Sequence, residues 1–83
     1  MAVTVHPTVR EILGEVPGGI VNGFNDTFTT ASTFRFGTTR LYLNGVRQKL
    51  GAGHDYVENG TAISVTFAVP PKPGDNVLID YFR

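Results

Sequence analysis

The chain has 83 residues, of which 41% are hydrophobic and 17% charged, and this balance predicts one small globular domain. Seven basic and seven acidic residues cancel to a net charge of zero, which argues against a nucleic-acid-binding domain. The lack of Cys excludes disulfides and Cys-based zinc sites, and no apolar run is long enough to span a membrane. Ten Gly and five Pro indicate many tight turns, and hence an all-β fold.

The small size of the chain sets an expectation about its partners. A domain this short buries only about 60% of its unfolded surface, so its core alone is marginal. Since no disulfide can staple it, we expect it to form a homo-oligomer or to dock on something larger. The N-terminus lacks the basic and apolar regions of a signal peptide, so the chain is expected to be soluble and not exported by that route.

Residues 1–19 differ from the rest and are predicted to form an N-terminal arm and linker. Pro7 suits the first turn of a short helix over residues 8–13, and Pro17-Gly18-Gly19 would end it. The alternatives are an extended arm and a disordered leader, because chain ends are the usual place for disorder. The apolar residues of this arm are the predicted partner-binding residues: Val3, Val5, Val9, Ile12 and Leu13.

Residues 20–83 are predicted to form a small antiparallel β-sandwich of about six or seven strands. Short runs that alternate apolar and polar residues recur between turn signals, at spacings typical of a sandwich. Phe28, Ile63, Val65 and Phe67 are expected to face inward. The last run, residues 77–82, is apolar on nearly both faces apart from Asp80, and should therefore lie in the middle of its sheet or be covered on its second face.

Asn44-Gly45 is the strongest local signal in the chain. A two-residue type I′ turn needs positive φ at both positions, which Asn tolerates and Gly adopts freely. This turn pairs Leu43 with Val46, Tyr42 with Arg47 and Arg40 with Lys49. The predicted core face of the hairpin holds Leu41, Leu43 and Val46, and its outer face holds Arg40, Tyr42, Arg47 and Lys49.

The outer face of this hairpin allows two interpretations. One is a basic, aromatic patch that binds an acidic partner, helped by a cation–π contact between Tyr42 and Arg47. The other is a solvated strand face whose cations prevent edge pairing. The zero net charge favours the second.

Catalytic chemistry is not predicted. His54-Asp55 could supply two metal ligands, but no third ligand has supporting spacing. Ser32 and Ser64 lie outside any nucleophile-elbow pattern, and the carboxylates are scattered over turns and strand ends. We therefore expect no enzyme, no metal and no cofactor.

Three stretches together resemble a small β-sandwich module of structural proteins of tailed bacteriophages. They read VPGGIVNGFNDTFTTAS, LYLNGVRQKLGAGHDYVENG and AISVTFAVPPKPGDNVLIDY, and they cover nearly the whole chain after the arm. The combination of Asn44-Gly45, Asp55-Tyr56 and Gly74-Asp75 is its most specific part. In longer proteins such modules look like repeated units of tail fibres and head-associated fibres, and the family has no catalytic residues.

The resemblance implies a non-enzymatic virion structural protein, made in the host cytoplasm. This chain is the module with only an N-terminal extension, which favours a head decoration or cement protein that binds the outside of an assembled capsid. Its partner would be the major capsid protein or another virion protein. The alternatives are a tail-fibre, head-fibre or neck component, an excised fibre domain, and a carbohydrate-binding module that stacks Tyr42 or Tyr56 on a sugar. Deletion of residues 1–15 is expected to leave the sandwich folded and to weaken attachment.

Overall fold

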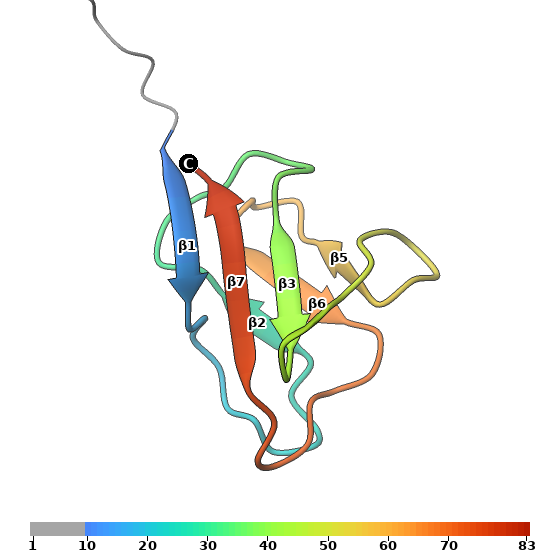
Figure 1. Cartoon of the computed structure of the whole chain (residues 1–83). Coiled ribbons are helices and arrows are strands. Elements are labelled where there is room, and N and C mark those ends of the chain that lie inside the picture. Colours follow the sequence, from blue (N-terminus) through green and yellow to red (C-terminus); the bar gives the residue numbers. More distant parts are fainter. Residues whose placement is uncertain (1–9) are drawn as a thin grey trace, which may run out of the picture.

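The computed structural model describes residues 10–83, which form seven β-strands and no helix (Figure 1). The all-β prediction is therefore confirmed. The strands are β1 (Glu11–Glu15), β2 (Thr27–Thr29), β3 (Arg40–Leu43), β4 (Val46–Arg47), β5 (Tyr56–Glu58), β6 (Ser64–Phe67) and β7 (Val77–Phe82).

Two antiparallel sheets make up the sandwich. One has four strands in the order β1-β7-β3-β4, and the other has three in the order β2-β6-β5. β7 lies inside the larger sheet, as its apolar character on both faces predicted. Its residues alternate strictly: Val77, Ile79 and Tyr81 are buried in the core, while the residues between them are half-buried on the outer face.

The core between the sheets is rich in aromatic residues. Phe28 of β2 and Phe67 of β6 meet edge to face with their ring centroids 5.5 Å apart. Each fully buried side chain of this size stabilises the fold by about 1.5–3 kcal/mol relative to exposure. The buried apolar residues are Phe28, Phe34, Leu41, Tyr56, Val65, Phe67, Val77, Ile79 and Tyr81.

Both open sides of the sandwich are bridged by the chain itself. After β1 the chain crosses to the smaller sheet, where Gly18 forms an antiparallel bridge with Thr29 of β2. On the other side Leu50, which follows β4, bridges to Tyr56 of β5. Because the bridges occupy backbone groups at the sheet edges, they reduce the backbone available for pairing with other chains.

The central turn forms as predicted. Asn44 and Gly45 have φ values of 52° and 81°, and the pairs Tyr42–Arg47 and Leu43–Val46 are present. Two finer predictions are wrong. Val46 is 64% exposed, because it lies on the outermost strand of the larger sheet, which three opposing strands do not cover fully. Arg40 pairs with Asp80 of β7, not with Lys49.

The predicted helix over residues 8–13 is wrong where the structure describes it, because Glu11–Glu15 is strand β1. A helix this short is marginal in water, whereas β7 offers a strand edge to pair with. β1 pairs through Glu11–Phe82, Ile12–Tyr81 and Glu15–Ile79. The sheet therefore begins before the domain boundary predicted between residues 19 and 20. Val3, Val5 and Val9 lie outside the described residues.

Candidate functional site

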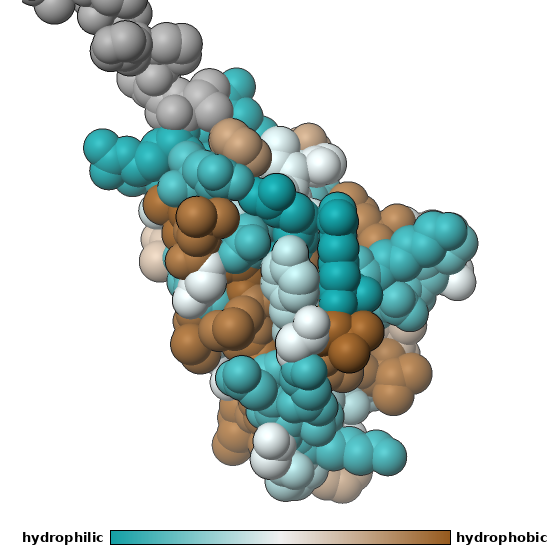
Figure 2. All heavy atoms as spheres, viewed as in Figure 1, coloured by the Kyte–Doolittle hydropathy of each residue, from teal (hydrophilic) through white to brown (hydrophobic). Residues whose placement is uncertain are grey.

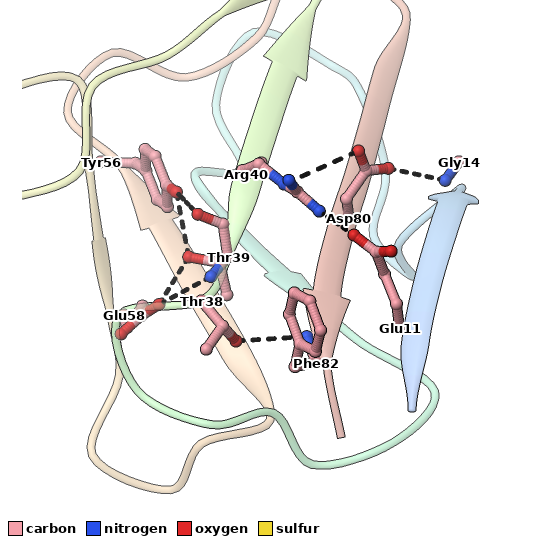
Figure 3. Close-up of polar contacts among 9 residues, drawn as sticks. All are labelled: Glu11, Gly14, Thr38, Thr39, Arg40, Tyr56, Glu58, Asp80 and Phe82. Carbon is pink, nitrogen blue, oxygen red and sulfur yellow. Dashed lines mark hydrogen bonds and ion pairs between the residues drawn. The ribbon is translucent and has the colours of Figure 1, made fainter. Parts of the chain in front are cut away.

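A buried polar cluster joins β5 to the start of β3 (Figure 3). The Tyr56 hydroxyl lies 2.9 Å from both Oγ1 and the carbonyl oxygen of Thr39. Oε2 of Glu58 accepts a hydrogen bond from the Thr39 hydroxyl at 2.5 Å, and Oε1 accepts one from the Gly37 N–H. Burial raises the pKa of Tyr56. Since these polar groups bond to one another, the cluster stabilises the fold and leaves little to act on a ligand.

Arg40 is the centre of a second cluster, on the outer face of the larger sheet (Figure 3). It forms an ion pair with Glu11 of β1, and its Nε lies 4.0 Å from Oδ2 of Asp80 on β7. Its guanidinium also lies over the Phe82 ring, 6.0 Å from the centroid. The hydrogen bond to Glu11 raises the pKa of Arg40. The cluster ties three neighbouring strands together and neutralises Arg40.

The predicted hairpin patch is therefore only partly assembled. Tyr42 is half-buried opposite Arg47, and Arg47 and Lys49 are exposed. Lys49 lies after the end of β4 and donates its N–H to Oδ2 of Asp55 at 2.8 Å, so this segment pairs with the loop before β5 and not with Arg40. Partner binding by Arg40, Tyr42, Arg47 and Lys49 remains a prediction, with Arg40 already paired within the chain.

Glu15 closes the sandwich at the β1 edge. A bulge at Gly14, whose φ is 66°, interrupts the pairing of β1 with β7. Oε1 of Glu15 then accepts a hydrogen bond from the Tyr81 hydroxyl at 2.6 Å, and Oε2 accepts one from the Ala31 N–H at 2.9 Å. One carboxylate thus joins β1 to β7 and to the loop after β2.

Three exposed large apolar residues lie within eight positions of the chain at and after β1, and we call them the N-terminal flank: Leu13, Val16 and Ile20. Their exposed fractions are 66%, 72% and 65%. Figure 2 shows hydrophobic side chains on the β1 side of the molecule, and others on the opposite side of the same view. The two predicted arm residues that the structure describes have different environments. Leu13 is exposed and belongs to the N-terminal flank, whereas Ile12 packs against the core.

His54 and Asp55 lie on the exposed loop before β5. The Asp55 carboxylate accepts the Lys49 N–H, and the His54 N–H donates to the Gly51 carbonyl at 3.0 Å. Within residues 10–83, no cluster of three or more His, Asp or Glu side chains could hold a metal ion. These two residues therefore form part of a structured turn.

Phe24 is a surface residue that sequence reasoning missed. It is 88% exposed, the highest value among the exposed large hydrophobic residues. In the sequence, Asn22-Gly23 and Asn25 flank Phe24 and indicate a turn. The sequence alone does not show whether the phenyl ring of Phe24 points into the core or into solvent.

Comparisons of the chain with protein-family models, with curated proteins and with solved structures found no match. In the part of the chain that the structure describes, no helix has the length and apolar character needed to cross a membrane.

Proposed function

We propose that this chain is a non-enzymatic structural protein that attaches to a larger protein assembly. The specific form of the proposal is a head decoration or cement protein of a tailed phage, which binds the outside of the assembled capsid. The single observation that carries it is the N-terminal flank, where three large apolar side chains are each about two-thirds exposed. Exposed apolar residues gathered on one edge are typical of interaction surfaces.

The flank suits attachment for two further reasons. Leu13 and Val16 are on or next to β1, whose pairing with β7 holds the backbone in place before a partner arrives. A prepositioned backbone reduces the ordering cost of binding. The flank also follows directly on residues 1–9, which contain the apolar residues Val3, Val5 and Val9 and could extend the same contact.

The sequence resemblance to phage structural modules supplies the specific setting for this attachment. The cluster of Tyr56, Thr39 and Glu58 supports a non-catalytic role, since its side chains form hydrogen bonds to one another within the fold. A chain with a modest core also gains stability by binding only in its folded form, which favours a partner that is already assembled.

Copy number in purified particles is the most direct test. Quantitative mass spectrometry of particles of the phage that encodes the chain should find hundreds of copies if it decorates the head. A handful of copies would favour a neck, tail-fibre or head-fibre component instead. Absence from the particle would contradict both forms of the proposal.

A surface variant tests the flank itself. Leu13→Ser with Val16→Ser should reduce the number of copies that bind to shells lacking the protein, while the thermal unfolding midpoint stays close to that of the parent chain. Val46→Ser is the matched control, because Val46 is also a large apolar residue, is 64% exposed, and lies on the opposite edge strand β4. Undiminished occupancy of the double variant would contradict attachment through the flank.

The carbohydrate-binding alternative has less support. Tyr56 is only 1% exposed, so its ring lies in the core and cannot stack on a sugar. Tyr42 is half-buried on the outer face of β3. Sugar-binding sites commonly use an open aromatic platform, and of the two tyrosines only Tyr42 is left to form one.

A further inference from the structure

The loop that carries Phe24, which we call the Phe24 loop (residues 20–26), is held in one conformation by its own side chains. Oδ1 of Asn22 accepts hydrogen bonds from the N–H groups of Phe24 and Asn25 at 2.9 and 2.8 Å. Nδ2 of Asn25 donates to the carbonyl oxygens of Ile20 and Thr27. The loop thus presents an 88% exposed phenyl ring on a fixed backbone. Such a side chain loses little freedom when a partner binds it.

A hollow of about 270 Å³ opens at the same end of the molecule. The apolar part of its lining, which we call the apolar hollow, consists of Leu43, Phe67, Ala68, Val69 and Pro70. A cavity of roughly 150 Å³ holds a benzene molecule, so this hollow has room for one phenyl ring.

The Phe24 loop and the apolar hollow are neighbours. The Gly23 N–H donates to the carbonyl of Pro71 at 2.8 Å, and Pro71 follows directly on Pro70 of the hollow. The Phe67 N–H donates to the carbonyl of Asp26, the last residue of the loop, also at 2.8 Å. Figure 1 shows this loop and the loop before β7 together at the lower end of the molecule.

The closeness of the Phe24 loop to the apolar hollow suits a two-fold symmetric dimer. In a two-fold dimer the same patch is used by both copies, so a protruding group and its receiving hollow must lie close together on one surface. The Phe24 loop and the apolar hollow meet that condition. The groups that border this end, Asp26, Asp55, Asp75 and Lys72, are net acidic, so like charges on the two copies weaken the contact.

We propose that two copies of this chain associate through this end, each inserting Phe24 into the apolar hollow of the other. The occupant of the hollow is thus a second copy, and the contact is independent of any capsid. A lipid surface fits less well, because Asp26, Asp55 and Asp75 border this end and only Lys72 would attract an anionic membrane.

The contact should be weak in solution. Each phenylalanine buries about 150–250 Å² on full insertion, so two of them reach less than half of the 1,200–2,000 Å² of a standard interface. We expect a dissociation constant on the order of 100 µM. Copies held side by side on a larger assembly would be at high local concentration, where such a contact takes effect.

Sedimentation velocity of the full chain tests the proposal. The concentration should run from about 10 µM to 1 mM, a range that brackets the expected dissociation constant of the dimer. The weight-average sedimentation coefficient should rise with concentration toward that of a dimer. Phe24→Ala should abolish the rise without loss of folding, because the ring is exposed. Ala68→Leu, which fills the hollow, should weaken it as well. Phe36→Ala is the matched control, since Phe36 is also an exposed phenylalanine, at 61%, and lies outside the Phe24 loop and the apolar hollow; it should leave the rise unchanged.

A crosslink tests the geometry. The chain has no Cys, so Phe24→Cys with Ala68→Cys introduces the only two thiols. Mild oxidation should give a covalent dimer, and each single-Cys variant should give much less under the same conditions. A coefficient that stays monomeric across the range, or a dimer insensitive to Phe24→Ala, would overturn the proposal. Because the chain is tested alone, this result is separate from attachment to a shell.

Discussion

At the scale of the residue, Glu15 joins separate parts of the sandwich at the β1 edge. Its carboxylate accepts the Tyr81 hydroxyl at 2.6 Å and the Ala31 N–H at 2.9 Å, from two different parts of the fold. Glu15→Ala leaves both donors without this partner and should lower the free energy of unfolding by about 1–3 kcal/mol. Urea unfolding at pH 7 measures the change.

Glu11→Ala is the control for this prediction. It removes the ion pair between Glu11 and Arg40, whose side chains are 39% and 31% exposed. Ion pairs this exposed contribute about 0–1 kcal/mol to the free energy of unfolding. If Glu15→Ala costs no more than Glu11→Ala, then Glu15 is not the residue that closes the β1 edge.

Two buried tyrosines make the fold sensitive to alkali. Burial raises the pKa of both Tyr56 and Tyr81, and for Tyr81 the hydrogen bond to Glu15 raises it further. Above about pH 10 the unfolded chain loses these phenolic protons while the folded chain retains them, so the free energy of unfolding must fall. The contribution is fully present below that pH and is lost as the pH rises through the raised pKa values.

Urea unfolding between pH 8 and about 11 should therefore show a steep alkaline loss of stability. Tyr81→Phe removes one of the two groups and should make that loss shallower, whatever it does to stability at pH 7. An alkaline slope identical in Tyr81→Phe and the parent chain would contradict the role of Tyr81.

At the scale of the element, the hairpin from β3 to β4 depends on the backbone conformation of its turn. Gly45 has a φ of 81°, and a Cβ added there would meet no atom within 4 Å. Substitution therefore introduces backbone strain without a steric clash. Gly45→Val should destabilise the fold by well over ~1 kcal/mol, and Gly45→Ala by less, because a β-branched residue is the most strained at positive φ.

Gly60→Ala is the matched control for the turn. Gly60 also has open space around its Cα, but it is not among the glycines with positive φ. The thermal unfolding midpoint should fall clearly for Gly45→Val and change little for Gly60→Ala. Equal shifts in both variants would mean that the strain at Gly45 is not the cause.

Strand β1 changes the expected effect of truncation. Removal of residues 1–15 deletes β1, takes Ile12 from the core and leaves the edge of β7 unpaired, so we expect a markedly lower unfolding midpoint and aggregation. This replaces the sequence-based expectation that the sandwich stays folded. Removal of residues 1–9 keeps all of the described sheet and should shift the free energy of unfolding by no more than about 0.5 kcal/mol.

At the scale of the whole molecule, the two sheets should unfold together. They share one core, and Gly18–Thr29 and Leu50–Tyr56 bridge them on both sides. Far-UV circular dichroism, which reports strands, and tyrosine fluorescence, which reports the core, should give the same midpoint on heating. Two separate midpoints would show that the sheets are independent units.

The sequence by itself determined the features that rest on short-range conformational preference. Asn44-Gly45 specified the turn because the preference of these two residues for positive φ does not depend on distant parts of the chain. Alternation placed Phe28, Val65 and Phe67 in the core, since side chains of a strand point to opposite faces whatever its partner. The apolar run of β7 likewise indicated a central strand.

Only the tertiary structure decided which distant segments meet. Residues 11–15 became strand β1 because β7, more than sixty positions away, offered an edge and a place for Ile12. The same strand pairing places Arg40 beside the carboxylates of Glu11 and Asp80, and places the Glu15 carboxylate within hydrogen-bond distance of the Tyr81 hydroxyl. The outward direction of Phe24 depends on how its loop docks on Pro71. Local spacing does not encode such partners, because they are selected by burial and hydrogen bonding across the complete fold.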